Sequence, residues 1–388
     1  MTLVVVYNPV CGDRTAEKFF NEEVLPRLKE QGKIPDKVIA TTHPNHAGET
    51  IVELLKQTTE SLTVILGSGD GTLHEIATSL HHSLDRQVQS QVAIVLVPCG
   101  TANALYSSLF PSQSDDPSYR LKSLNLYLSP SPTSIVLSSA TTVVHPSQPG
   151  GDTRSSVAIV VASTALHAAI LHDSEALRSS HPGIERFKIA AQQNITRWYH
   201  ARVKLVPSHE HESVELYDVS RRSFIAVTEE GSIELEGPFT YFLSTVNVDR
   251  LESLFRIAPL HATLPSRTPA LDIVIVRPLR NPTINDDSEG SRLRFAEQGG
   301  IVLGGAYRDG AHVNMIYGSD GSVGSEENSG QSVVEYYRCG GWEWIPDRDD
   351  EHARFVCVDG EIFNIEAGGK ATTSISGNIH GTQLSIFA

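Results

Sequence analysis

The sequence predicts an α/β plus β protein: an N-terminal Rossmann-like domain with a parallel sheet, followed by a mostly antiparallel β domain. Up to about residue 130, short apolar segments alternate with segments of helical periodicity. This alternation is typical of a parallel sheet covered by helices on both faces. After the Pro-containing segment 129–132, most apolar segments are short and strand-like. We therefore expect an α/β domain over residues 1–130 and a β-rich domain over residues 131–388.

In the first domain, each expected strand is followed by an expected helix. The strands are Leu3–Tyr7, Lys37–Thr41, Thr63–Leu66 and Val92–Val97. The helices are Thr15–Lys29, His46–Gln57, Leu73–Leu80 and Ala102–Leu109. In open parallel sheets, ligands bind beyond the carboxyl ends of the strands.

The second domain is predicted to contain short strands and one clear helix, roughly Ile184–Tyr199. Its expected strands are Ile135–Ser138, Val157–Val161, Phe224–Val227, Phe239–Val246, Leu271–Val276 and Phe355–Val358.

The composition indicates a folded protein that does not attract nucleic acid through its overall charge. With 46 acidic and 31 basic residues, the formal net charge is −15, which opposes binding to polyanions. The apolar segments are far too short to span a bilayer, and the N-terminus lacks the basic flank of a signal peptide. We expect a cytoplasmic protein. Its four cysteines show no C-x-x-C spacing, so we expect free thiols and no zinc site.

Three of the expected strands in the first domain end in glycine-containing loops at strand-to-helix junctions. These loops are Asn8–Arg14, Gly67–Thr72 and Pro98–Asn103. Unpaired backbone N–H groups and the helix dipole favour an anion at such junctions, and glycine lets the backbone approach a phosphate closely. Three such loops on one sheet edge predict a phosphate-binding site.

Asp70 lies between two glycines of the second loop. The spacing G-x-G-x-G differs from the dinucleotide fingerprint, and the chain contains no Walker sequence. An acid at this position would repel phosphates, so it needs either Mg²⁺ or a hydroxyl group to deprotonate. We therefore interpret Asp70 as the general base of a phosphoryl transfer.

These segments resemble the catalytic domain shared by diacylglycerol, sphingosine and ceramide kinases. The second loop, from Ser68 to Gly71, together with His74-Glu75, is particularly similar to the sphingosine kinase branch. The other matching segments follow in the family's order. They are Asn8-Pro9 with Gly12, Thr41–Ala47, Pro98–Leu105 and Val358–Glu361.

The resemblance implies an ATP- and Mg²⁺-dependent lipid kinase with one site between its two domains. Asp70 would take the proton from the lipid hydroxyl, and Asp359 and Glu361 would complete the site through Mg²⁺. Glu75 would help to position the nucleotide, and Arg178 and Arg186 would reach its phosphates from the second domain. The nucleotide would be cradled by Asn8, Gly12, Thr41, Ser68, Gly69, Gly71, Thr72, Gly100, Thr101 and Asn103.

Two segments depart from the family's pattern. The first loop has Val10-Cys11 where relatives commonly have a basic residue and glycine. Ala169 and Leu171 occupy positions where sphingosine kinases carry acids that hold the sphingoid head group, and Asp173 is the nearby candidate to replace them. The lipid therefore stays open between a sphingoid base, diacylglycerol and related lipids.

Two alternative functions also stay open. An NAD kinase would share the Gly-Asp-Gly core, but such enzymes carry an Asn-Glu pair after it, and none follows Gly71. The other alternative is a catalytically degenerate relative that binds nucleotide or lipid and regulates a partner. A lipid kinase is also expected to contact membranes transiently and to hold its substrate in an apolar pocket of the β-rich domain.

Overall fold

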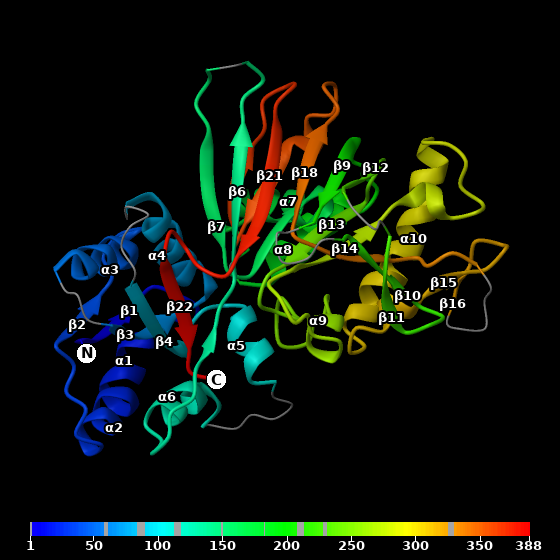
Figure 1. Ribbon diagram of the computed structural model, residues 1–388. Coiled ribbons are helices and arrows are strands. Elements are labelled where there is room, and N and C mark those ends of the chain that lie inside the picture. The colour runs from blue at the N-terminus through cyan, green and yellow to red at the C-terminus, as the bar shows by residue number, and fades with distance from the viewer. Residues whose placement is uncertain are drawn as a thin grey trace.

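The computed structural model describes residues 2–57, 61–83, 90–111, 118–148, 150–181, 183–207, 213–227, 231–324 and 330–388. The N-terminal helices and strands form one lobe, and most of the later strands form the other (Figure 1). The predicted fold class is confirmed, because the first sheet is mostly parallel and the larger sheets that follow are antiparallel.

In the described part of the chain, the first domain is built on a six-stranded sheet of order β2-β1-β3-β4-β22-β5. Its first four strands are β1 (Thr2–Tyr7), β2 (Lys37–Ala40), β3 (Leu62–Ser68) and β4 (Ser90–Pro98). Every residue of the central strand β3 is buried, because helices cover both faces of the sheet. These helices are α1 (Ala16–Phe19), α2 (Leu25–Glu30), α3 (His46–Gln57), α4 (Asp70–Ser83), α5 (Ala104–Leu109) and α6 (Lys122–Tyr127). A π-helical segment, Phe20–Val24, joins α1 to α2.

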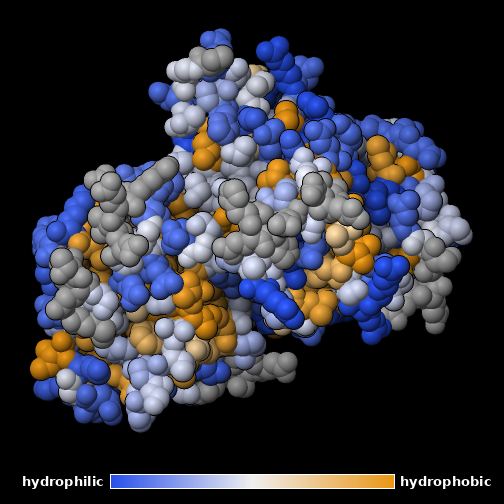
Figure 2. All heavy atoms as spheres, viewed as in Figure 1, coloured by the Kyte–Doolittle hydropathy of each residue, from blue (hydrophilic) through white to orange (hydrophobic). Residues whose placement is uncertain are grey.

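The end of the chain returns to the first sheet. Strand β22 (Thr382–Ile386) pairs in parallel with β4, and β5 (Ile135–Val136) pairs antiparallel with β22. Leu384 is buried, whereas both residues of the edge strand β5 are exposed. Figure 2 shows apolar atoms gathered on this face of the first domain. The structure thus differs from the predicted boundary, since two segments after residue 130 belong to the first sheet.

Two antiparallel sheets form most of the second domain. Among the described residues, the larger has the order β11-β10-β17-β14-β13-β8-β19-β20 and the smaller the order β12-β9-β18-β21-β6-β7. The larger sheet comprises β8 (Val161–Thr164), β10 (Glu215–Asp218), β11 (Ser223–Ala226), β13 (Tyr241–Thr245), β14 (Leu271–Val276), β17 (Glu335–Cys339), β19 (Phe355–Val358) and β20 (Glu361–Asn364). The smaller comprises β6 (Ser139–His145), β7 (Arg154–Ala158), β9 (Ala201–Val206), β12 (Ile233–Glu236), β18 (Gly341–Pro346) and β21 (Lys370–Ser376). A short hairpin is formed by β15 (Ile316–Tyr317) and β16 (Val323–Gly324).

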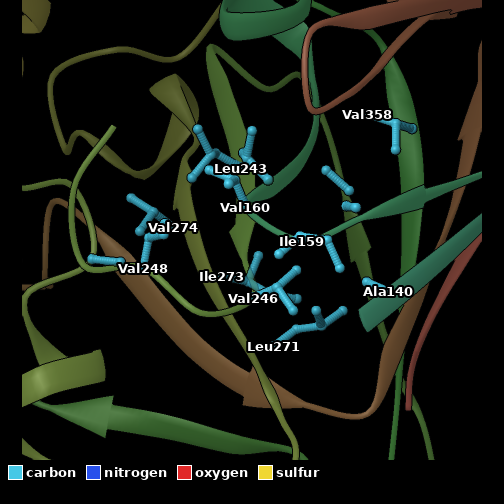
Figure 3. Close-up of a cluster of buried hydrophobic side chains, with 14 of the residues drawn as sticks. Ala140, Ile159, Val160, Leu243, Val246, Val248, Leu271, Ile273, Val274 and Val358 are labelled. Carbon is cyan, nitrogen blue, oxygen red and sulfur yellow. The ribbon is translucent and has the colours of Figure 1, made fainter. Parts of the chain in front are cut away.

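Aromatic and aliphatic side chains fill the space between these two sheets. Trp342 and Trp344 of β18 are buried, and their rings lie 5.3 and 5.4 Å from that of Phe242 on β13. Trp342 Nε1 also donates a hydrogen bond to Ser244 Oγ at 3.0 Å. Figure 3 shows aliphatic side chains of both sheets gathered in one cluster. The two sheets therefore share one hydrophobic core, which gives the second domain a rigid frame.

The helices of the second domain are α7 (Ala165–Ala176), α8 (Glu185–Asn194), α9 (Leu260–Thr263) and α10 (Glu289–Ala306). The predicted helix over 184–199 is shorter in the structure, because the chain extends after Asn194 and Tyr199 forms a β-bridge with Phe239. No helix in the described part of the chain combines the length and the apolar composition that crossing a membrane requires.

Helix α4 of the first domain lies against strand β7 of the second. Thr78 Oγ1 accepts a hydrogen bond from Val157 N at 3.2 Å and lies 3.2 Å from Ser156 Oγ. His82 Nε2 lies 3.0 Å from the carbonyl oxygen of Ser155. Because α4 begins at Asp70, these polar contacts fix the second domain relative to the candidate base.

Leu384→Ala is expected to destabilise the first domain, although the residue lies close to the C-terminus. A buried Leu→Ala substitution costs about 2–5 kcal/mol, and weaker packing of β22 uncovers the edge of β4. We expect a lower urea midpoint and faster amide hydrogen exchange in β4. The control is Gln383→Ala, an exposed position on the same strand. Equal exchange in β4 for both variants would contradict this placement of β22.

Candidate functional site

The loops after β1, β3 and β4 pack against one another backbone to backbone. Gly12 has a φ of 50°, and a Cβ at this position would lie 2.2 Å from the carbonyl oxygen of Cys99. A Cβ on Gly100 would lie 2.4 Å from the Cα of Gly69. Only glycine fits at these two contacts without displacing backbone. The glycines therefore allow three loops to meet at one edge of the sheet.

Asp70, the first residue of α4, joins the second loop to the third. Its Oδ2 accepts a hydrogen bond from Ala104 N at 2.7 Å, and its Oδ1 accepts one from Leu105 N at 3.1 Å. The carboxylate thus caps α5. The side chain of Asn103 instead forms two hydrogen bonds with the backbone of Gly100: its Oδ1 accepts from the N–H at 2.9 Å, and its Nδ2 donates to the carbonyl oxygen at 2.8 Å. Each carboxylate oxygen has a second lone pair, so Asp70 can still accept a proton or a further hydrogen bond.

The environment makes Asp70 a stronger base than an ordinary aspartate. Burial is the main reason why the pKa of Asp70 rises to about 6, and the charge of Asp359 also raises it. The two backbone hydrogen bonds act in the opposite direction. The two carboxylates come from different domains, and His74, one turn after Asp70, lies 3.7 Å from Asp359 Oδ2. A carboxyl group with this pKa is still mostly ionised at neutral pH.

Three other predicted nucleotide residues shape or expose the second loop. The hydroxyl oxygens of Ser68 and Thr72 lie 2.5 Å apart, and both side chains are buried, so this pair stabilises the turn. A Cβ on Gly71 would meet no atom within 4 Å. The backbone at Gly71 is therefore open to a ligand.

The remaining predicted residues of the first domain lie around the same sheet edge. Asn8 Oδ1 accepts a hydrogen bond from Val10 N at 3.0 Å, which shapes the first loop. Thr41 follows β2, and Thr101 is exposed in the third loop. Glu75 is half-buried on α4, and burial raises its pKa.

Asp359 is buried in the turn between β19 and β20 and binds backbone N–H groups. Its Oδ2 accepts a hydrogen bond from Ile159 N at 2.6 Å, and its Oδ1 accepts from Val160 N and Val161 N at 3.0 and 2.7 Å. These three residues form the crossover from β7 in the smaller sheet to β8 in the larger. Asp359 therefore fixes the point where the chain passes between the two sheets.

His74, one helical turn after Asp70, connects this turn to the first domain. Its Nε2 lies 3.2 Å from Glu361 Oε2, and its Nδ1 lies 2.9 Å from the Val157 oxygen and 3.7 Å from Asp359 Oδ2. Burial alone would lower the pKa of His74, but the hydrogen bonds and charges of Asp359 and Glu361 raise it to about 10. The ring is therefore an imidazolium, and both of its N–H groups point to oxygen atoms across the domain junction.

Glu361 is the better placed of the two predicted magnesium ligands. Mg²⁺ prefers carboxylate and phosphate oxygens. Oε2 of Glu361 binds His74 and accepts a hydrogen bond from Ser156 Oγ at 2.8 Å, and Oε1 takes part in neither contact. Both oxygens of Asp359 are already engaged by backbone N–H groups. The donor set thus fits a cation that is held mainly by nucleotide phosphates and touched by Glu361.

A cleft of about 520 Å³ lies between the loops and the second domain. The second domain contributes the segment just before α8 to its lining. The lining residues are Gly12, Asp13, Pro98, Cys99, Gly100, Thr101, Asn103, Tyr119, Arg120, Gly183 and Ile184. Two of the three predicted phosphate loops therefore face the second domain across this space.

The two predicted arginines both pair with Glu175, Arg186 at 3.9 Å, but lie in different environments. Arg178 is exposed and pairs with Glu175 at 2.7 Å. The Arg186 side chain is only 13% exposed, and its Nε has no hydrogen-bond partner among the described residues. Arg186 follows Ile184 of the cleft lining by two residues, so it is the better candidate to reach a phosphate.

The segment aligned with the head-group acids of sphingosine kinases forms α7. Ala169 is buried in the core. One carboxylate oxygen of Asp173 lies 2.8 Å from His172 Nδ1, and the other accepts a hydrogen bond from Asn194 Nδ2 at 2.7 Å. Asp173 therefore ties α7 to α8.

A narrow apolar cavity of about 30 Å³ lies beside α10. It is lined by Leu166, Ile195, Thr240, Tyr241, Ile257, Val274, Val276, Phe295, Ala296, Gly299, Val302, Leu303 and His312. Leu166 stands at the start of α7, directly after β8, and β8 pairs with the strand that leads to Asp359. One wall of the apolar cavity is thus continuous with the strand that supports the polar site.

Most of the first domain is similar to a known family. Residues 2–127 match the model of the diacylglycerol kinase catalytic domain. The matched segment contains Asp70, His74 and all three glycine loops.

Curated proteins that resemble this chain are lipid kinases. Sphingosine kinase 1 of Arabidopsis thaliana is 28% identical over 214 residues, which cover 54% of this chain and 41% of that protein. Sphingosine kinase 1 of Rattus norvegicus is 33% identical over 107 residues, or 28% of this chain and 27% of the relative. Mitochondrial acylglycerol kinase of Homo sapiens is 28% identical over 106 residues, which cover 27% of this chain and 24% of that protein. The chain thus spans less than half the length of these relatives.

A solved structure shares the fold of the whole chain. It is the crystal structure of a Bacillus anthracis str. Sterne protein classed as a diacylglycerol kinase, with a TM-score of 0.53 and 14% identity. The match covers 100% of this chain and 95% of that one. The two-domain arrangement of this chain is therefore shared by that structure.

The roles of His74, Ser156 and Arg120 cannot be predicted from local sequence. His74 belongs to a segment that resembles the kinase family, but its partner Glu361 lies 287 positions away. Arg120 and Tyr119 follow the third loop but carry no local motif, and only the folded chain brings them into the cleft.

His74→Gln is expected to lower stability most at acidic and neutral pH. The folded-state pKa of about 10 exceeds the ordinary value of 6.5. The imidazolium therefore stabilises the fold fully below about pH 6.5, and this contribution is lost as the pH rises through about 10. The free energies of unfolding of the parent and H74Q, measured with urea at several pH values, should converge over that range.

Glu361→Gln serves as the partner variant in this measurement. It removes one of the charges that raise the pKa of His74. The difference in free energy of unfolding between variants with and without His74, and its dependence on pH, should therefore be smaller in the E361Q background. The double variant should be only slightly less stable than H74Q alone, because both changes remove the same interaction between His74 and Glu361. A constant gap between the parent and H74Q across pH 6.5–10 would contradict the charged state of His74.

Proposed function

We propose that this chain is an ATP-dependent lipid kinase that transfers the γ-phosphate to a hydroxyl group of a sphingoid base, diacylglycerol or a related lipid. The position of Asp70 carries the proposal. Its carboxylate lies where three glycine loops meet, at the start of α4 and near Asp359 of the other domain. The diacylglycerol kinase catalytic domain and the lipid kinase relatives support this class of reaction.

In this proposal, ATP lies in the cleft with its phosphates against the glycine loops. Backbone N–H groups at the loops and the open face of Gly71 receive the phosphates. Arg120 of the cleft lining supplies positive charge, and Arg186 is the candidate to add charge from the second domain. Mg²⁺, when bound to the phosphates and Glu361, would neutralise negative charge that repels the attacking oxygen.

Asp70 accepts the proton of the lipid hydroxyl as its oxygen attacks the γ-phosphorus and ADP leaves. The backbone hydrogen bonds from Ala104 and Leu105 hold the carboxylate in one orientation, which favours in-line attack. Most of the rate would come from positioning and charge neutralisation, because phosphoryl transfer leaves little covalent chemistry for the protein.

The cavity beside α10 is the proposed site of the lipid's hydrocarbon chain. Its free space of about 30 Å³ holds one or two water molecules, so α10 must move to admit an alkyl chain. Gly290, Gly300 and Gly304 lie in α10 at positions where a Cβ would meet no atom within 4 Å. Packing therefore does not require these glycines, and each weakens the helix by about 1 kcal/mol relative to alanine.

The surroundings of α7 favour an uncharged head group. Ala169 replaces an acid that would bind the ammonium group of a sphingoid base, and Asp173 is engaged with His172 and Asn194. An acylglycerol hydroxyl needs no such acid. Since these lipids reside in membranes, the proposal includes transient contact with a membrane surface.

Asp70→Asn is expected to abolish phosphoryl transfer while ATP affinity stays within several-fold. The amide keeps the shape of the side chain but cannot accept the proton. In the parent, kcat/KM should rise with pH as the carboxyl group ionises around its pKa of about 6. Labelled ATP with diacylglycerol, monoacylglycerol, ceramide and sphingoid bases gives the rates.

The same assay separates catalysis from capping and from a purely regulatory role. Loss of the α5 cap alone would cost about 1 kcal/mol of stability and leave a measurable kcat in D70N. Persistent transfer in this variant would show that Asp70 is not the base. Binding of ATP with no transfer by the parent to any lipid would favour the regulator.

Gly299→Leu is expected to reduce phosphorylation of long-chain lipids at least about tenfold without changing the KM for ATP. A Cβ at Gly299 points toward Ile195 of the cavity lining, so the larger side chain fills the space needed by the hydrocarbon chain. Gly300→Leu is the matched control, because it adds the same side chain to the next position, where space is open. Equal kinetics for G299L and G300L would exclude the cavity as the lipid site.

A further inference from the structure

Cys11 and Cys99 come from two different loops and meet at the edge of the cleft. Cys11 packs against the apolar cluster that contains Cys99, and its Sγ donates a hydrogen bond to the Asn8 carbonyl oxygen at 3.0 Å. The backbone holds the two thiols near each other, because Gly12 packs directly against the Cys99 carbonyl group. The sequence predicts free cysteines without paired spacing, and the structure brings these two together.

Arg120 is fixed in position beside the pair. Its Nη2 donates to Cys99 Sγ at 2.9 Å, and its Nε donates to the Pro98 oxygen at 3.0 Å. Its guanidinium also lies 3.9 Å from the centre of the Phe19 ring. A thiol that accepts a hydrogen bond from a guanidinium group is stabilised as a thiolate, which is the reactive form.

The other two cysteines lack this environment. Cys339 and Cys357 are buried in the second domain, and burial raises the pKa of each to about 12. In contrast, the interaction with Cys11 and the charge and hydrogen bond of Arg120 lower the pKa of Cys99 to about 7, against the effect of burial, which raises it. Cys11 is partly exposed, and Cys99 lines the cleft. An oxidant in solution can therefore reach the pair.

We propose that Cys11 and Cys99 form a peroxide-sensitive dithiol that closes to a disulfide at the nucleotide cleft. One thiolate attacks hydrogen peroxide and becomes a sulfenic acid, with release of water. The second thiol then displaces the sulfenic hydroxyl as water, and the S–S bond forms. Two thiols and one peroxide thus give one disulfide and two waters, and the two electrons pass from sulfur to the peroxide.

Closure changes the geometry of the first and third loops. The two sulfur atoms must approach to about 2.05 Å to form a disulfide, which draws Cys11 away from the Asn8 carbonyl group. The loops are packed backbone to backbone, so this movement shifts the N–H groups that face the cleft. We expect nucleotide affinity to fall at least about tenfold, as when one charge-assisted hydrogen bond is broken. This last step rests on the proposed nucleotide site, whereas formation of the disulfide does not.

The test treats the full reduced chain with hydrogen peroxide and identifies linked peptides by mass spectrometry. We expect a Cys11–Cys99 peptide pair that is two hydrogens lighter than the separate thiols and is released by dithiothreitol. Before oxidation, saturating ATP should slow alkylation of Cys11 and Cys99 but not of Cys339. Cys339→Ser is the control and should form the same disulfide. Failure to form it in the parent, or stepwise oxidation of either thiol without a link, overturns the dithiol.

Binding of a fluorescent ATP analogue by the reduced and oxidised chains separates the two proposals. Weaker binding after oxidation that returns with dithiothreitol, and that is absent in Cys11→Ser, supports the coupling. Equal binding in both states overturns the coupling. If the disulfide forms but neither state binds the analogue, the proposed nucleotide function fails while the dithiol stands.

Discussion

The position of the candidate site depends on the buried carboxylate of Asp359. It accepts three backbone hydrogen bonds at the β7–β8 crossover and faces the imidazolium of His74. A buried carboxylate without such partners would be strongly disfavoured. With them, it ties both sheets of the second domain to helix α4. Since α4 begins at Asp70, the same contacts set the distance between the candidate base and the second domain.

The three loops show how structural and chemical roles combine in one residue. Asp70 caps α5 and so holds the third loop against the second, yet each oxygen keeps a lone pair for a proton. Glycines 12 and 100 are required by contacts between loops, whereas Gly71 has open space beside it. Glycine is therefore needed for close backbone packing at some positions of these loops, whereas at Gly71 it leaves the backbone open to a ligand.

The order of strands and helices in the first domain could be predicted because each signal is local. The return of β22 could not, since Leu384 and Ile386 form a short apolar segment that gives no sign of its partner β4. The Asp359-Gly360 pair reads as a hairpin turn, and the structure does form that turn, with φ values of 48° and 100°. What the sequence could not reveal was that the carboxylate points back into the domain junction. The contact between His74 and Glu361 was hidden for the same reason, because it depends on two domains meeting.

The unusual first loop also has a physical explanation in the folded chain. Val10-Cys11 supplies no positive charge where related kinases commonly have a basic residue. Arg120 reaches the same cleft from the segment before α6 and is held there by Pro98, Cys99 and Phe19. A guanidinium fixed by three contacts loses little side-chain entropy when a phosphate binds. In the proposed nucleotide site, Arg120 would therefore supply the charge that the first loop lacks, and the thiol of Cys99 helps to hold its guanidinium group.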